Sequence, residues 1–309
     1  MKVNLDKCVK ADNRKYFAKN YQYYLMLLIP LLYYAVFKYA PLYGIVIAFK
    51  DYSVFSTIWE APWVGLEVFR EIFNMKDFIY ALRNTLMLSF LSILVCFPGP
   101  IILAIMLNEV REKWLKKSIQ SIVYLPHFLS WVIIGGIATQ LLSENGAVNV
   151  FISSMGLGKV PFLTNDIWWI ISYLFVNVWH SIGWGAIVYL AAITGISSDL
   201  YEAASIDGCN KMKQILYVTI PGIRPTIVIM FILNIGNVLT IGFEQIDSLS
   251  NPLVMKYADV ISMFVYRVGL NNGDFSTATA VGLFNSVVSF MLVTLTNGIS
   301  KKLTESSLW

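Results

Sequence analysis

The feature that most constrains this chain is a succession of long apolar stretches, separated by shorter segments that hold most of its charged residues. A helix of about 20 apolar residues crosses a bilayer core, because a helix satisfies its own backbone hydrogen bonds. Only 14% of the 309 residues are charged, against about 25% in soluble domains. We therefore predict an all-α polytopic membrane protein with six transmembrane helices. The expected spans are residues 21–49, 85–107, 119–142, 167–193, 223–246 and 277–299.

The second expected span contains the sequence Pro98-Gly99-Pro100. Proline has no backbone N–H group, so it cannot continue the hydrogen-bond ladder of a helix. Neighbouring helices can satisfy the freed carbonyl groups in a membrane protein. We predict a kink or swivel at this point of the span.

Basic residues predict how the chain is oriented. An even number of spans puts both termini on one side, and Lys and Arg concentrate on the cytoplasmic side of membrane proteins. Residues 1–20 form a basic tail, the loop 108–117 carries further basic residues, and Lys301 and Lys302 follow the last span. We therefore expect both termini in the cytoplasm and residues 21–309 to form one transmembrane domain.

The sequence argues against an enzyme and against a nucleic-acid-binding protein. Its cysteines are scattered and show neither a disulfide framework nor a metal spacing, and its histidines have no carboxylate at ligand spacing. The segment Gly156–Lys159 lacks the spacing and the Ser or Thr of a phosphate-binding Walker loop. A basic tail just before a span is typical of a cytoplasmic anchor. We predict no catalytic site, metal or cofactor in this chain.

The loop 195–222 is the most informative polar segment. Asp199 can cap a helix, and Glu202 lies three residues later, which is the spacing of a capping box. Gly208 can end this helix with a left-handed residue. Pro221 suits the first turn of the helix that follows. These residues predict a short helix, a break and a return to the membrane.

The same loop carries a spaced motif. It reads Glu202-Ala203-Ala204, then Gly208 after three residues, then Val218-Thr219-Ile220-Pro221 after nine. This resembles the EAA loop, E-A-A-x3-G-x9-I-x-L-P, of binding-protein-dependent ABC importer permeases. Val218 and Ile220 stand where that family prefers Ile and Leu, and both keep the apolar character.

The resemblance implies the type I ABC importer permease fold, in which this loop is a coupling helix that docks into a cleft of a cytoplasmic ATPase. Glu202 and Asp207 would meet basic or donor groups of the ATPase, while the two alanines would pack in its cleft. The residues assigned to this coupling are Glu202, Ala203, Ala204, Asp207, Gly208 and Pro221. ATP and Mg would be bound by that partner ATPase.

Further segments resemble the LplB-type polysaccharide permease group. They include Tyr124-Leu125-Pro126-His127-Phe128, Gly242-Phe243-Glu244-Gln245, Asn251-Pro252-Leu253-Val254 and the terminal Leu308-Trp309. The resemblance implies import of oligosaccharides, as polysaccharide fragments, across a bacterial cell membrane. It also implies a second homologous permease subunit, two ATPase subunits and an extracytoplasmic sugar-binding lipoprotein as partners.

Polar side chains within the expected spans indicate a substrate path. In the fourth span such residues are spaced by four, three and four positions, which places them on one helix face. A second polar series is expected roughly along one face of the fifth span, namely Asn234, Asn237, Thr240, Glu244 and Asp247. Amide, carboxylate and aromatic groups suit the hydroxyls and ring faces of sugars. We assign to the path Tyr173, Asn177, His180, Trp184, Asn237, Glu244 and Asn285.

Other interpretations stay open at this point. Asn, Ser and Thr side chains commonly bridge packed spans, so single path residues can instead hold helices together. An ion-coupled secondary sugar transporter with Glu244 as proton carrier is one alternative, but it leaves the Glu-Ala-Ala-x3-Gly loop unexplained. A non-transporting membrane sensor or scaffold is another.

Overall fold

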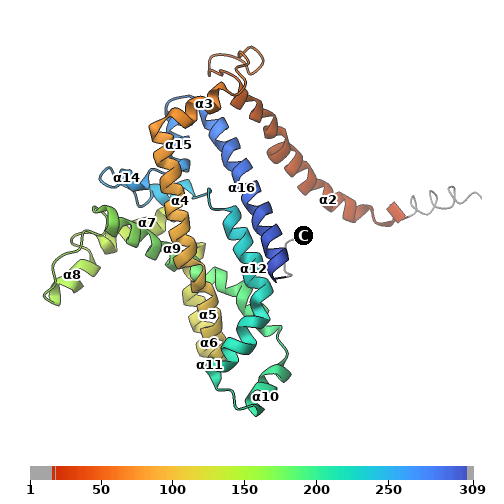
Figure 1. Cartoon of the computed structure of the whole chain (residues 1–309), viewed down its shortest axis with the longest axis vertical. Coiled ribbons are helices and arrows are strands. Elements are labelled where there is room, and N and C mark those ends of the chain that lie inside the picture. The colour runs from red at the N-terminus through yellow and green to blue at the C-terminus, as the bar shows by residue number, and fades with distance from the viewer. Residues whose placement is uncertain (1–15, 18, 305–309) are drawn as a thin grey trace, which may run out of the picture.

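Helices joined by loops make up the part of the chain that the computed structural model describes, residues 16–17 and 19–304 (Figure 1). Five helical segments are long and apolar enough to cross a membrane. A sixth span is obtained when Lys113–Phe128 and Trp131–Ser154, which are bent by 106°, count as one. The all-α prediction is confirmed. Most of the basic tail at 1–20, and Leu308 and Trp309, lie outside the described residues.

The helices form two consecutive series along the chain, residues 21–154 and residues 166–304, and η marks a 3-10 or π helix. The first series is α2 (Tyr21–Tyr34), η1 (Ala35–Tyr39), η2 (Ala40–Phe49), α3 (Glu67–Asn74), α4 (Lys76–Cys96), α5 (Pro98–Glu109), α6 (Lys113–Tyr124), η3 (Leu125–Phe128), α7 (Trp131–Leu142) and α8 (Ala147–Ser154). The second is α9 (Asp166–Thr194), α10 (Ser198–Ile206), α11 (Lys211–Gln214), η4 (Ile215–Thr219), α12 (Ile220–Gly236), α13 (Phe243–Asp247), α14 (Met255–Ala258), α15 (Ile261–Tyr266), η5 (Arg267–Asn271) and α16 (Phe275–Thr304).

The first span stands apart from the others over most of its length. Figure 1 shows α2 running away from α16, and the most apolar window of this span has 0% of its residues buried. Only its end, η2, returns to pack on α16, where Ala48 is buried. A helix that is apolar all round needs lipid or another protein to cover it.

The second span has the predicted break. α4 ends at Cys96 and α5 begins at Pro98, and together they form one candidate span of 34 residues. The helix begins at Lys76 rather than at the expected position 85. The helix continues beyond the apolar stretch because Asp77 lies in its first turn, where a negative charge suits the positive end of the helix dipole, and because Arg83 is a good helix former.

The third and fifth expected spans differ from prediction. Residues 119–142 do not form one straight helix, because the chain turns at Pro126 in η3, and the Ser130 side chain then accepts a hydrogen bond from Ile133 N and starts α7. The fifth span starts at Lys211 and ends at Gly236 rather than near 246. Loop residues follow it, so the polar series expected on one face of this span is divided between two elements.

Two clusters of the core meet along α9. One cluster packs α9 residues such as Trp169 and Tyr173 against α4, α7 and the segment from α13 to Val260. Another packs Tyr189 and Ile193 of α9 against α5 and α12. A Cβ atom added at Gly183 would lie 2.0 Å from the Val123 carbonyl oxygen, so only glycine lets α6 lie this close to α9. The central helix α9 therefore positions its polar side chains between the two clusters.

Candidate functional site

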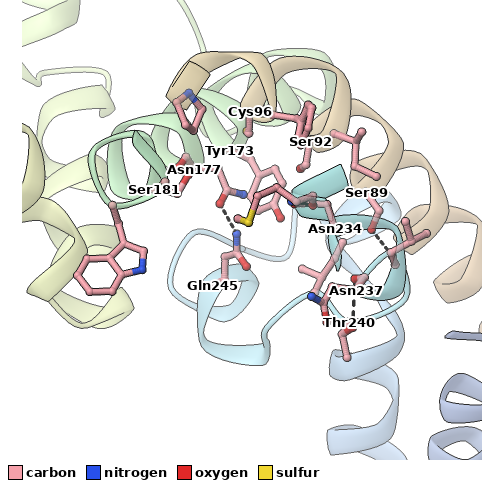
Figure 2. Close-up of a pocket in the computed structure, with 18 of the residues that line it drawn as sticks. Ser89, Ser92, Cys96, Tyr173, Asn177, Ser181, Asn234, Asn237, Thr240 and Gln245 are labelled. Carbon is pink, nitrogen blue, oxygen red and sulfur yellow. Dashed lines mark hydrogen bonds between the residues drawn. The ribbon is translucent and has the colours of Figure 1, made fainter. Parts of the chain in front are cut away.

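A cavity of about 320 Å³ lies between α4, α5, α9, α12 and the segment that leads into α13. It falls between two core clusters, since Tyr173 of one and Tyr189 of the other both line it. Figure 2 shows polar side chains pointing into it from these elements. The polar lining consists of Ser89, Ser92, Cys96, Tyr173, Asn177, Ser181, Asn234, Asn237, Thr240 and Gln245.

Hydrogen bonds fix this lining across elements that are distant in the sequence. Gln245 Nε2 donates to Asn177 Oδ1 at 2.5 Å, which joins α13 to α9 (Figure 2). The Ser89 hydroxyl donates to the Val238 carbonyl oxygen, which joins α4 to the loop that follows α12. None of the described residues that line the cavity carries a charge. The cavity therefore offers neutral hydroxyl and amide groups beside aromatic rings, a combination suited to a ligand rich in hydroxyl groups.

The structure brings only some of the predicted path residues together. Tyr173, Asn177, Trp184 and Asn237 all line the cavity. Tyr173 is the most enclosed of them, with 2% of its surface exposed. The remaining predicted path residues, His180, Glu244 and Asn285, do not line the cavity.

His180 lies in an aromatic stack beside the cavity. Its ring centroid is 4.2 Å from that of Trp131 and 5.3 Å from that of His127. The His127 ring in turn stacks on Trp184, with centroids 4.6 Å apart and planes 8° from parallel. His180 therefore supports the wall through His127 and Trp184, because rings packed in this way fix one another's orientation.

Glu244 and Asn285 occupy other places. Glu244 is exposed on the short helix α13 and lines a second cavity of about 460 Å³, together with Asp247. Its neighbour Gln245 is the residue of this helix that enters the first cavity. Asn285 of α16 donates to the Leu239 carbonyl oxygen at 3.4 Å, and its Oδ1 atom is buried without a hydrogen-bond partner.

The cavity also contains residues that the sequence did not point to, namely Ser89, Ser92, Cys96, Ser181 and Gln245. Ser89, Ser92 and Cys96 are spaced by three and four residues, which is the signature of one helix face. That spacing was available, but small polar residues are common in membrane helices that merely pack together.

The loop 195–222 contains a short helix, as predicted, namely α10. α10 projects at the end of the molecule opposite α3 (Figure 1). Its N-cap is Ser197, whose hydroxyl accepts a hydrogen bond from Asp199 N at 3.2 Å, so the prediction that Asp199 caps the helix was wrong. Gly208 follows the helix with φ +76°, the predicted left-handed conformation. Pro221 lies in the first turn of α12, also as predicted.

The surface of α10 is open to a partner. Glu202, Ala203, Asp207 and Gly208 are exposed, and Ala204 is half-buried. Ile206, which the sequence did not single out, is 87% exposed. A cleft of about 650 Å³ separates α10 from the end of α5, and a salt bridge of 3.3 Å between Lys211 Nζ and Glu109 Oε2 crosses beside it.

Comparisons with known proteins agree with this architecture. Residues 97–304 match the protein family described as binding-protein-dependent transport system inner membrane component. Protein LplB of Bacillus subtilis (strain 168) is 41% identical over 287 residues, which are 93% of this chain and 90% of that protein. The polygalacturonan/rhamnogalacturonan transport system permease protein YteP of the same organism is 42% identical over 287 residues, covering 93% of this chain and 89% of that protein.

A solved structure resembles the whole described fold. It is a chain of a bacterial ABC transporter involved in the import of the acidic polysaccharide alginate, with 40% sequence identity and a TM-score of 0.85. The match covers 95% of this chain and 99% of that chain. A chain of a bacterial alginate ABC transporter solved in complex with alginate pentasaccharide-bound periplasmic protein gives a TM-score of 0.86 at 40% identity, with the same coverage of both chains.

Proposed function

This chain belongs to the family of binding-protein-dependent transport system inner membrane components, and we propose that it forms half of the translocation path of an ATP-driven importer of oligosaccharides. The membership makes it a transport subunit of the membrane rather than an enzyme. The observation that carries the proposal is that the same bundle of spans holds both a neutral hydrogen-bonding cavity and the exposed helix α10.

The substrate class follows from relatives and from the cavity. Relatives that are 40% to 42% identical are named for polygalacturonan, rhamnogalacturonan and alginate transport. Amide and hydroxyl groups such as those of Asn177 and Gln245 can exchange hydrogen bonds with sugar hydroxyls, and Trp184 offers a ring face for a sugar ring. We infer that fragments of polysaccharides pass through this cavity.

We infer the partners from the family of this chain and from the apolar surface and the helix α10 that it leaves exposed. A second homologous permease would complete the path and cover part of the exposed apolar surface, with lipid covering the rest. Two copies of a separate ATPase would bind ATP and Mg, and one of them would receive α10. An extracytoplasmic sugar-binding lipoprotein would deliver the oligosaccharide at the opposite end. Both termini and α10 would then lie in the cytoplasm, in agreement with the basic residues around residues 108–117 and Lys301.

In this proposal the chain passes a movement of the ATPase to the membrane spans. Closure of the ATPase pair on ATP would push α10, whose residues Glu202, Ala203, Ala204, Asp207 and Gly208 would face the ATPase. The spans attached to α10 would tilt and change which side of the membrane the cavity opens to. The neutral cavity would hold the sugar through hydroxyl contacts weak enough to be released within each cycle.

The experiment is gentle purification of the complex from its native membrane through a tag on this chain. We expect a second permease, an ATPase and a sugar-binding protein to co-purify, and ATP hydrolysis in proteoliposomes to rise with loaded binding protein. Oligosaccharides of galacturonate and of mannuronate are the first substrates to test for uptake. Uptake that survives ATP depletion but stops when ion gradients collapse would instead indicate secondary transport, and absence of any ATPase would contradict the proposal.

A further inference from the structure

The helix α10 is held to the rest of the chain without a buried residue of its own. Most helices in proteins are fixed by burial of an apolar face. A helix without such a face can turn on its supports when it is pushed. What links α10 to the membrane spans must therefore be its chain connections and its polar contacts.

The side-chain hydrogen bonds that leave α10 join it to the segment that follows it in the sequence. The Tyr201 hydroxyl lies 3.0 Å from Thr219 Oγ1, and Gln214 Nε2 donates to Ser205 Oγ at 2.8 Å. Thr219 and Gln214 are buried, with 2% and 7% of their surfaces exposed. Both belong to the segment that begins the fifth span, and within the described residues no side-chain hydrogen bond joins α10 to α9.

The segment that receives these contacts reaches the cavity. Lys211–Gly236 is a single candidate span of 26 residues, about 39 Å long at 1.5 Å per residue. Its cytoplasmic end carries Thr219, and its other end carries Asn234, which lines the cavity. Thr219 lies at the end of the π helix η4, a local widening of the helix that is frequent at functional sites.

We propose that Tyr201 and Thr219 are positioning residues that attach the coupling helix to the fifth span. Movement of α10 is thereby passed to α12 and to the cavity wall at Asn234, and the Ser205–Gln214 hydrogen bond supports the same attachment. The chain leading back to α9 through Gly195 transmits less, because only the backbone and local turns connect it to α10. This inference rests on the proposed function, since it needs an ATPase that pushes on α10.

The test uses single isosteric changes in the full complex. Thr219→Val and Tyr201→Phe each remove one hydroxyl group at nearly constant volume, and Thr219→Ser keeps the hydroxyl. Tyr217→Phe is the matched control, because Tyr217 lies in the same segment and is 68% exposed. All variants carry Cys8→Ser and Cys209→Ser, so that Cys96, which lines the cavity, is the only thiol of this chain.

The readout is the rate at which a small thiol reagent labels Cys96, measured by mass spectrometry of its peptide with and without ATP. In the parent complex we expect ATP to change this rate. In Thr219→Val and in Tyr201→Phe the ATP-dependent change should shrink roughly threefold to tenfold, the range that one hydrogen bond contributes. The double variant should be no worse than either single variant, and Thr219→Ser and Tyr217→Phe should resemble the parent.

The rate without ATP and the amount of bound ATPase serve as checks on folding and assembly. The inference is overturned if the parent responds to ATP and both single variants respond fully. It is also overturned if the two losses add in the double variant, since independent effects would not need the shared bond. A parent complex whose Cys96 ignores ATP would contradict the proposed function itself, and with it this inference.

Discussion

The helix α10, which we propose couples to an ATPase, and the cavity of this protein are built in opposite ways. α10 and Gly208 come from one short stretch of the chain, exposed and shaped by local rules. The cavity takes its lining from α4, α5, α9, α12 and α13, which meet only after the chain has folded. The shape of an element formed from one stretch of chain depends mainly on its own backbone. The shape of a cavity lined by several helices depends on pairs of side chains from different helices.

The largest effect should come from the backbone of the coupling segment, by which we mean α10 and the residues up to Gly208. Gly208→Val places a β-branched residue at φ +76°, which costs about 1–3 kcal/mol and redirects the chain after α10. We expect uptake in proteoliposomes to fall about tenfold or more, by the conversion of such energies into equilibrium constants.

Gly273 provides a matched control for that change. It has φ +73° and, like Gly208, nothing within 4 Å of an added Cβ atom, but it lies in the loop before α16. Gly273→Val should therefore carry a similar strain without disturbing the ATPase contact. If both variants lose the same share of ATP-coupled uptake, strain alone explains the loss and the coupling segment has no special role.

A smaller effect is expected from a side-chain pair of the cavity. Asn177→Leu and Gln245→Leu each remove one partner of the bond between α9 and α13. We expect uptake to fall by roughly threefold to tenfold in each, as for the loss of one hydrogen bond, while the ATPase stays bound. The two losses should not add, because the residues form one pair.

Gln140→Leu is the matched control for the cavity pair, since Gln140 lines the second cavity instead. Uptake in this variant should equal that of the parent. A loss as large as in Gln245→Leu would indicate that the second cavity, rather than the first, forms the path.

The smallest effect is expected at Glu244. This residue is exposed and lines the second cavity, whereas Asn177 and Gln245 line the first. Glu244→Gln removes its charge at constant size, and we expect uptake to change by less than about twofold, as for most exposed substitutions. Uptake should be measured between pH 6 and pH 8 with the ion gradients intact, because a proton carrier at this position would leave the parent active and make the variant inactive.

Sequence reasoning succeeded where structure is local. The left-handed Gly208, the first-turn Pro221 and the break at Pro98 all follow from backbone chemistry of single residues. The cap of α10 was missed by two positions, because Ser197 and Asp199 are both good caps and only the fold decides between them.

Prediction failed where the fold brings distant residues together. The expectation that residues 223–246 form one helix placed Glu244 on the same face as Asn237, but the helix ends at Gly236 and the next helix turns Gln245 inward instead. Hydropathy could not show this end, because the loop residues that follow, such as Val238 and Leu239, are as apolar as the span itself. Likewise, α6 and η3, which precede the bend, pack against α9, and hydropathy does not report that contact.

The central claim is that α10 faces the cytoplasm and receives force from an ATPase. It is tested most directly by Ala203→Cys, since Ala203 is exposed on α10, with Cys8, Cys96 and Cys209 replaced by Ser and a photoreactive thiol reagent attached. In inside-out vesicles we expect illumination to cross-link this position to the ATPase subunit. We also expect the yield of this cross-link to change when ATP is added. Labelling of the same cysteine by a membrane-impermeant reagent applied to the outside of intact cells, with no cross-link to an ATPase, would contradict the account.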